Sequence, residues 1–295
     1  MSIYSIKDLE RITGIKAHTI RIWEKRYNII DPNRSESNIR SYCDEDLKKL
    51  LNISILNRTG FKISSISKFT SAQINEKILD VLKPDSDYKS QIEALIISMI
   101  ELCEVRFENI INQSITNFGF EDTLFNIVFP FFEKVGLLWQ LGTICPVQEH
   151  FISNLIRIKL SVAIDSLPIV SNTLAKRIFL FLPEWELHEL GLLTYYYLAR
   201  KQGFKVFYFG QKVPLSDLLD IENIAKPDML VTFFVCAKSK TEILDYLEKL
   251  NAIFSNRPIL ISGGQAANII SEIPKNMKII QGAIAFKKEL DLFEK

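Results

Sequence analysis

The chain has 295 residues, with 36 Lys and Arg against 35 Asp and Glu, and 47% of its residues are apolar, which is ordinary for a folded protein of two or three domains. No apolar run approaches the length of a membrane span, and the first residues, MSIYSIKDLE, lack the apolar core of a signal peptide. These features argue against a membrane or secreted protein, and we expect a soluble, cytoplasmic one.

The charge is divided unevenly along the chain. Residues 1–70 have 13 Lys and Arg against 8 Asp and Glu, a net charge of +5, whereas the remaining residues have 23 against 27, a net charge of −4. A basic first segment favours a polyanionic partner. The four cysteines form no CxxC pair and are expected to be reduced thiols: Cys43, Cys103, Cys145 and Cys236.

Residues 1–70 predict a helix-turn-helix. Ser5 is placed to cap a first helix, and Asp8 lies where an acidic residue favours the helix N-terminus. The residues TGI at 13–15 predict a tight turn, and KAHTIRIWEKRY at 16–27 predicts a second helix. Such a pair of helices is typical of DNA-binding proteins.

The second helix presents a polar, mostly cationic face, as a helix that enters a DNA groove requires. The residues that we expect to contact DNA are His18, Thr19, Arg21 and Lys25 of this helix and Arg34, Arg40 and Tyr42 of a wing-like loop after it. From the pattern alone, a helical protein-interaction module with a solvated basic face is the alternative.

The middle segment, residues 88–167, predicts a helical bundle. Apolar residues recur at helical spacing in 91–119, 120–142 and 145–167, and Pro146 is well placed in a first helical turn. Taken alone, Trp139 and His150 indicate only core packing and a surface polar residue.

Residues 170–295 alternate between strands and helices. Strands are expected at 177–182, 205–209, 229–235, 258–262 and 278–281, and helices at 189–201, 215–224, 239–251, 265–272 and near 286–294. This pattern predicts an α/β flavodoxin-like (Rossmann-type) domain with a five-stranded parallel sheet in the order 2-1-3-4-5. Ligands of such sheets bind beside the first strand, which is followed here by EWELHELG at 184–191.

His188 in that loop is suited to three roles: general base, pH switch or metal ligand. The domain has no second histidine and no nucleophile motif, so a lone imidazole fits best a metal that brings its other ligands in a macrocycle. Glu186 is placed to hold the far ring nitrogen, and Gly191 to let the next helix approach a bulky ligand. Ser262, Gly263 and Gly264 follow the fourth strand at the same sheet edge.

Three motifs carry a resemblance to known families. TIRIWE at 19–24 with RSY at 40–42 resembles the MerR-type winged helix-turn-helix, and E-x-H-x-x-G at 186–191 with SGG at 262–264 resembles the cobalamin-binding domain. Trp139 followed by Glu149 and His150 resembles the helical cap of the CarH/LitR-type light-sensing MerR regulators. Together these motifs span nearly the whole chain.

The resemblance implies a role for each motif. Arg21, Arg40 and Tyr42 would meet the DNA backbone, and His188 would ligate cobalt from below in place of the dimethylbenzimidazole tail. That tail would pass Thr232 and lie beside Ser262, Gly263 and Gly264. Trp139, Glu149 and His150 would lie over the upper, adenosyl face of adenosylcobalamin.

This chain departs from the family pattern at several positions. Gln140 stands where the light-sensing branch has a histidine that binds cobalt after photolysis, so a bis-histidine photoproduct is not expected unless His150 substitutes. Glu186 replaces an aspartate, Thr232 stands where serine is common, and FFVCA at 233–237 is bulky and apolar.

We therefore predict a cobalamin-dependent transcriptional regulator rather than an enzyme. Residues 1–70 would form the DNA-binding head, 88–167 a cobalamin cap and 170–295 the cobalamin-binding domain of a dimer or tetramer that binds an operator. Two alternatives stay open: a MerR-type regulator whose cofactor fold serves only oligomerisation or partner binding, and a corrinoid methyltransferase component.

Overall fold

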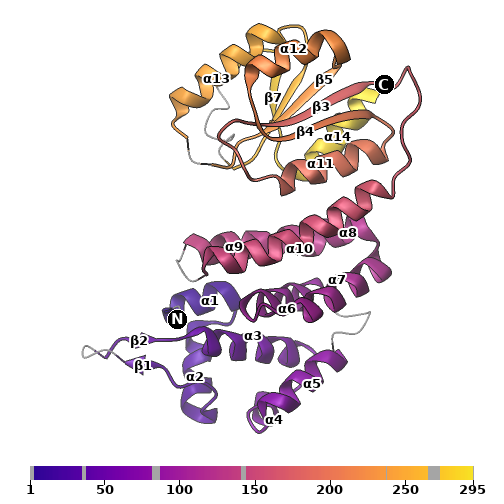
Figure 1. Ribbon diagram of the computed structural model, residues 1–295. Coiled ribbons are helices and arrows are strands. Elements are labelled where there is room, and N and C mark those ends of the chain that lie inside the picture. Colours follow the sequence, from indigo (N-terminus) through magenta and orange to yellow (C-terminus); the bar gives the residue numbers. More distant parts are fainter. Residues whose placement is uncertain are drawn as a thin grey trace. The chain divides into compact units, whose positions relative to one another are not determined.

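The computed structural model describes residues 3–34, 38–81, 87–140, 144–236, 238–264 and 273–294. The chain forms two compact units, residues 1–155 and residues 156–295 (Figure 1). Within the described ranges, no helix has both the length and the apolar character needed to cross a membrane.

The first unit begins with the predicted helix-turn-helix. At the start of α1 (Ile6–Thr13), the Asp8 amide donates to Ser5 Oγ over 3.2 Å and the Ser5 amide donates to the Asp8 carboxylate over 2.8 Å. Gly14 ends the helix with φ of +74°, a conformation that glycine adopts without steric cost. α2 (Ala17–Tyr27) follows at once, so the predicted pair of helices is confirmed.

A two-stranded antiparallel ribbon, β1 (Asn33–Arg34) and β2 (Arg40–Ser41), forms the predicted wing. Glu24 of α2 binds both wing arginines: Arg34 Nη2 lies 3.3 Å and Arg40 Nε 3.1 Å from its carboxylate. Because one carboxylate bridges two arginines, the wing and α2 are held as a single surface.

The rest of the first unit is helical. Its helices are α3 (Asp44–Arg58), α4 (Ile63–Ile66), α5 (Ser71–Val81), α6 (Tyr88–Ile100), α7 (Glu104–Phe118), α8 (Phe120–Thr123) and α9 (Phe129–Gln140). The expected helical stretch at 120–142 contains a π-helical turn, η1 (Leu124–Val128). α10 (Pro146–Asp165) begins at Pro146, as predicted, and its residues fall in both units.

The second unit contains the predicted parallel sheet. Its strands are β3 (Arg177–Pro183), β4 (Lys205–Val213), β5 (Met229–Phe233), β6 (Ile259–Ser262) and β7 (Met277–Ile279). They pair in the order β4-β3-β5-β6-β7, which is the predicted order 2-1-3-4-5. The central strand β3 has no accessible side chain from Ile178 to Leu182, because both faces of the sheet are covered.

Among the described residues, four helices cover the sheet: α11 (Leu190–Lys201), α12 (Leu215–Ala225), α13 (Lys240–Ile253) and α14 (Gly282–Glu294). α11 and α14 lie on one face, and α12 and α13 on the other (Figure 1). The second strand is longer than predicted and reaches Val213, and the last helix starts at Gly282. The helix expected at 265–272 lies outside the described residues.

A buried ion pair joins α3 to α6 inside the first unit. The guanidinium of Arg58 binds the Glu93 carboxylate and also donates to Ser54 Oγ over 2.6 Å and Ser90 Oγ over 3.2 Å. Glu93 is fully buried, and burial raises its pKa even though Arg58 opposes the shift. Lys134 of α9 adds a second connection by donating to the Ile12 carbonyl of α1 over 3.3 Å. The helix-turn-helix is therefore packed on the bundle helices as part of one core.

Replacing Arg58 with Met should lower the free energy of unfolding by about 3 kcal/mol, because the buried Glu93 carboxylate loses its charged partner. The double variant Arg58→Met/Glu93→Met should recover most of that loss, because an apolar pair leaves no unpaired charge. Urea unfolding followed by circular dichroism measures both.

Lys249→Met is the control, since it breaks only the exposed pair with Asp245 and should cost less than about 1 kcal/mol. A double variant that is no more stable than Arg58→Met alone would contradict this account of the pair.

Candidate functional site

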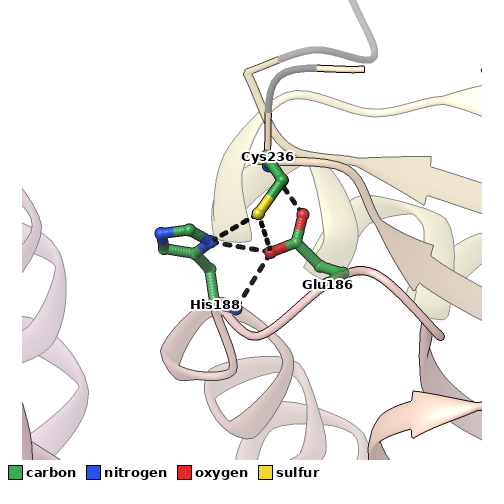
Figure 2. A group of neighbouring side chains, drawn as sticks. All are labelled: Glu186, His188 and Cys236. Carbon is green, nitrogen blue, oxygen red and sulfur yellow. Dashed lines mark hydrogen bonds and ion pairs between the residues drawn. The ribbon is translucent and has the colours of Figure 1, made fainter.

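The loop after β3 lies at the carboxyl edge of the sheet, where the strand order reverses between β4 and β5. β3 pairs with β4 on one side and with β5 on the other, so the connections that follow β3 and β4 run toward opposite sides of the sheet. The loop turns at once, with the Glu186 amide donating to the Pro183 carbonyl over 2.9 Å. This turn places the Glu186 carboxylate beside the His188 ring (Figure 2).

Glu186 is the buried anchor of this loop. Its Oε1 accepts from the amides of Leu187 and His188 over 2.9 and 3.0 Å. Its Oε2 accepts from the amides of Val235 and Cys236, each over 2.7 Å. Burial alone would raise the pKa of this carboxyl, but the hydrogen bonds from the His188 ring and from these amides outweigh burial and hold it well below its usual range. Glu186 is therefore ionised and joins the loop after β3 to the loop after β5.

The ring of His188 is hydrogen-bonded to this carboxylate. Its Nδ1 lies 2.7 Å from Glu186 Oε1, as the E-x-H spacing predicted, while its side chain is 60% exposed (Figure 2). An ionised carboxylate can only accept, so the ring must carry its proton on Nδ1. The lone pair then resides on Nε2, which Figure 2 shows on the side of the ring away from Glu186. An imidazole oriented in this way is suited to ligate a metal through Nε2.

Cys236 completes a cluster that the sequence did not indicate. Its Sγ lies 3.3 Å from Glu186 Oε1 and 3.5 Å from His188 Nδ1 (Figure 2). Burial and the neighbouring carboxylate raise the pKa of this thiol, so it stays protonated as a donor to Glu186. The signal was available, because Cys236 follows β5, which the predicted order places beside β3.

Glu186, His188 and Cys236 bring three potential ligand atoms within 4.8 Å of one another. This group does not resemble a closed metal site, which requires three or four ligands that are available to the ion. Glu186 is occupied by donors on both oxygens and Cys236 keeps its proton. The arrangement instead offers one nitrogen, which fits a metal whose other ligands come from a macrocycle.

The Thr232 side chain lies at the same carboxyl edge, on β5. It is fully buried, and its Oγ1 has no hydrogen-bond partner among the described residues. A buried hydroxyl without a partner is costly, so this atom is suited to hydrogen-bond a group that enters here. Ser262 on β6 is also buried, but its Oγ lies 3.0 Å from the hydroxyl of Tyr195, a residue that sequence reasoning missed.

The two glycines after β6 have different roles. A Cβ on Gly263 would lie 2.3 Å from the Phe234 carbonyl oxygen, and its φ is +102°, so the fold itself requires glycine there. A Cβ on Gly264 would meet nothing within 4 Å among the described residues. Among the described residues, Gly264 therefore has room beside it at the sheet edge.

Gly191 has a different neighbour from the one expected. A Cβ there would lie 2.7 Å from the Phe233 ring, so Gly191 lets α11 pack on β5. The expected close approach to a ligand is corrected to a close approach to Phe233.

The expected cap residues lie in the first unit. Trp139 at the end of α9 is 52% exposed. On α10, His150 Nδ1 lies 2.9 Å from Glu149 Oε2, and Ser153 Oγ donates to the same carboxylate. Gln140 ends α9, and its side chain lies outside the described part of the structure.

Most of the residues that were predicted to contact DNA have exposed or half-exposed side chains, whereas Tyr42 is buried. His18, Arg21 and Lys25 are exposed on α2, with Thr19 half-buried beside His18. Tyr42 is 1% exposed, pairs with Tyr4 through the backbone, and has no partner for its buried hydroxyl among the described residues. Its expected phosphate contact is therefore corrected: Tyr42 packs in the core of the head, because the wing folds back against the N-terminal segment.

Known proteins share the helix-turn-helix head and the helical segment that follows it. Residues 4–73 match the family described as MerR HTH family regulatory protein, and residues 91–164 match the family described as B12 binding domain. Two relatives from Myxococcus xanthus are HTH-type transcriptional repressors. CarH is 25% identical over 89% of this chain and 89% of its own length, and CarA is 24% identical over 88% and 85%.

A solved structure supports the fold. The monomethylamine corrinoid protein of Methanosarcina barkeri aligns with a TM-score of 0.52 and 17% identity, over 74% of this chain and 99% of that one. The chain thus combines a region that matches the MerR helix-turn-helix family with a region that matches the B12 binding domain family, and it is similar over most of its length to two transcriptional repressors.

Proposed function

We propose that this protein is a transcriptional regulator that binds an operator through α2 and the wing, and whose DNA binding is controlled by adenosylcobalamin held at His188. The observation that carries the proposal is His188 itself. Its Nδ1 proton is fixed by the buried Glu186 carboxylate, and its Nε2 lone pair faces away from that carboxylate at the switch point of the sheet.

The residues present fit a cobalamin bound with its nucleotide tail displaced. His188 Nε2 would be the lower ligand, and Glu186 would keep the ring in the ligating tautomer. Thr232 Oγ1 would hydrogen-bond the tail inside the sheet edge, Ser262 would line the same edge, and Gly264 would leave room for the tail. The Thr232 hydroxyl, which has no partner in the part of the chain that the structure describes, supports this placement of a polar group.

Control of DNA binding would come from the helical segment. Trp139, with its exposed indole, would pack on the adenosyl group, and the Glu149–His150 pair would supply polar contacts to it. When bound, adenosylcobalamin supplies a cobalt–carbon bond that light breaks. Loss of the adenosyl contacts would change which oligomer is stable, because the two states differ in contacts at Trp139 and Glu149. A dimer or tetramer binds DNA through several heads, so its dissociation would weaken DNA binding greatly.

The DNA surface would consist of the exposed cations on one side of the head. His18, Arg21 and Lys25 of α2 would enter the groove, with Thr19 beside them. Arg34 and Arg40 would reach the backbone from the wing, where Glu24 fixes their direction. No catalytic role is proposed for any of these residues.

The deciding experiment measures DNA affinity and oligomer size with and without adenosylcobalamin, in the dark and after illumination. The DNA is a sequence selected by the wild-type protein from a random pool. Dark protein with the cofactor should form the larger oligomer and bind tightly, and illumination should reverse both. His188→Ala should bind adenosylcobalamin at least roughly tenfold more weakly and lose the response.

Leu187→Ala is the matched control, because Leu187 directly precedes His188 and its side chain is exposed. Cofactor binding without a light response would indicate a sensor of the corrinoid itself. A wild-type protein that elutes colourless would favour a cofactor-free fold used for oligomerisation.

A separate prediction concerns the head. Arg21→Ala should weaken binding to all DNA sequences and reduce the salt dependence of log K by about 0.9, the value expected for one lost phosphate contact. Fluorescence anisotropy over a range of salt concentrations measures this. Lys249→Ala removes an equal charge from the exposed face of α13 and should leave the slope unchanged. An unchanged slope in Arg21→Ala would remove this residue from the phosphate contacts.

A further inference from the structure

The loop that carries His188 contains a second carboxylate, Glu189, which the proposed ligation of cobalt does not use. Its side chain is only 15% exposed. Arg157 of α10 forms a close ion pair with Oε2, and the Tyr208 hydroxyl donates to Oε1 over 2.5 Å. Gln211 Nε2 donates to Oε2 over 3.2 Å. One carboxylate thus collects three donors from two elements, α10 and β4.

A β-bulge in β4 creates this arrangement. Leu180 of β3 pairs with Tyr208, but the next residue of β3 pairs with Gly210, so β4 carries one extra residue there. Side chains three positions apart, at Tyr208 and Gln211, can then face the same way. Gly210 has φ of +75°, and a Cβ on it would lie 3.4 Å from Glu189 Oε1. The bulge therefore lets Tyr208 and Gln211 both point toward Glu189, and Gly210 leaves room for the Glu189 carboxylate.

The same network holds the backbone immediately before His188. Gln211 Nε2 also donates to the Leu187 carbonyl over 2.7 Å. On the other side, Glu186 binds the amides of Leu187 and His188 and the loop after β5. The backbone around His188 is thus held on two sides. Glu186 connects it to the loop after β5, and Gln211 and Glu189 connect it to β4 and α10.

This network differs from an ordinary surface ion pair. Tyr208 stacks on Tyr196 with ring centroids 4.9 Å apart. Burial and the hydrogen bond to Glu189 strongly raise the Tyr208 pKa, so the phenol is a permanent donor. Charge-assisted hydrogen bonds from partly buried donors restrict geometry far more than exposed pairs do.

We propose that Glu189 is a positioning residue for His188. Because Arg157, Tyr208 and Gln211 hold its carboxylate, Glu189 fixes the position of the imidazole and so strengthens the bond from Nε2 to cobalt. This inference rests on the proposed function, because it requires His188 to be the lower ligand. Outer contacts of this kind typically change metal affinity by roughly 10–100-fold. The Glu189 carboxylate binds Arg157, Tyr208 and Gln211, so it would act through the loop that carries His188 and not as a ligand.

Acid titration of methylcobalamin bound to the full chain tests the proposal. Protons compete with cobalt for Nε2, and the visible spectrum reports the fraction of nitrogen-ligated cobalt. In Glu189→Gln, a ligand bond weakened by about tenfold should raise the midpoint of histidine release by about one pH unit. Removal of a negative charge alone would make His188 harder to protonate and would lower the midpoint. The sign of the shift therefore separates positioning from simple electrostatics.

Glu289→Gln is the matched control. Glu289 is 19% exposed and pairs with Lys278 over 2.6 Å at the β7 edge of the same unit, so it should leave the midpoint unchanged. Tyr208→Phe removes one donor without changing the charge and should shift the midpoint in the same direction as Glu189→Gln, by a smaller amount. If Glu189→Gln does not fold, the midpoint of Tyr208→Phe tests the same proposal.

The outcomes distinguish the two claims. A midpoint that is unchanged or lowered in both variants, with wild type nitrogen-ligated, would overturn the role of Glu189 and leave His188 as the ligand. Wild-type protein that shows no nitrogen-ligated cobalamin at any pH would refute the proposed ligation, and the positioning role would fall with it.

Discussion

The buried carboxylate of Glu186 is the interaction on which the site depends. It joins two loops that are far apart in sequence, because β3 and β5 are neighbours in the sheet and their carboxyl ends meet. Four backbone amides and the His188 ring donate to this carboxylate and stabilise its negative charge. The charge in turn fixes the proton of His188 on Nδ1. A single ionised group therefore fixes the loop conformation, the tautomer of His188 and the direction of its Nε2.

The two units make complementary contributions to regulation. In the first unit, the Arg58–Glu93 pair and the contact from Lys134 to the Ile12 carbonyl fasten the helix-turn-helix to bundle helices. α9, which carries Lys134, also ends near Trp139. Under the proposed function, a change in the contacts of Trp139 would act on a helix that contacts α1 through Lys134. In the second unit, Glu186 binds the His188 ring, and Gln211 joins the Glu189 carboxylate to the Leu187 carbonyl.

Local patterns predicted much of this molecule. The capping of α1, the glycine turn before α2 and the strand order all follow from short-range signals or from the regular alternation of strands and helices. The contact between Glu186 and His188 was likewise predictable, because the two residues lie two positions apart in one loop. The resemblance to cobalamin-binding regulators agreed with the matched families.

Other features depend on three-dimensional placement that one sequence does not encode locally. Cys236 reaches Glu186 only because β5 lies beside β3, and the donors to Glu189 converge only because β4 has a bulge. Tyr42 was expected on the surface but is buried, since the wing pairs with the segment before α1. In each case a long-range contact, rather than residue type or spacing, decides the environment of the side chain.

The most direct test of the central claim is electron paramagnetic resonance of the Co(II) cobalamin complex, prepared with protein whose histidines carry ¹⁵N. If His188 is the lower ligand, the superhyperfine splitting from the axial nitrogen will change with the label, and His188→Ala will abolish the change. A splitting pattern that is the same with ¹⁴N and ¹⁵N histidine would show that the axial nitrogen comes from the cofactor's own tail. That result would contradict the role assigned to the Glu186–His188 pair.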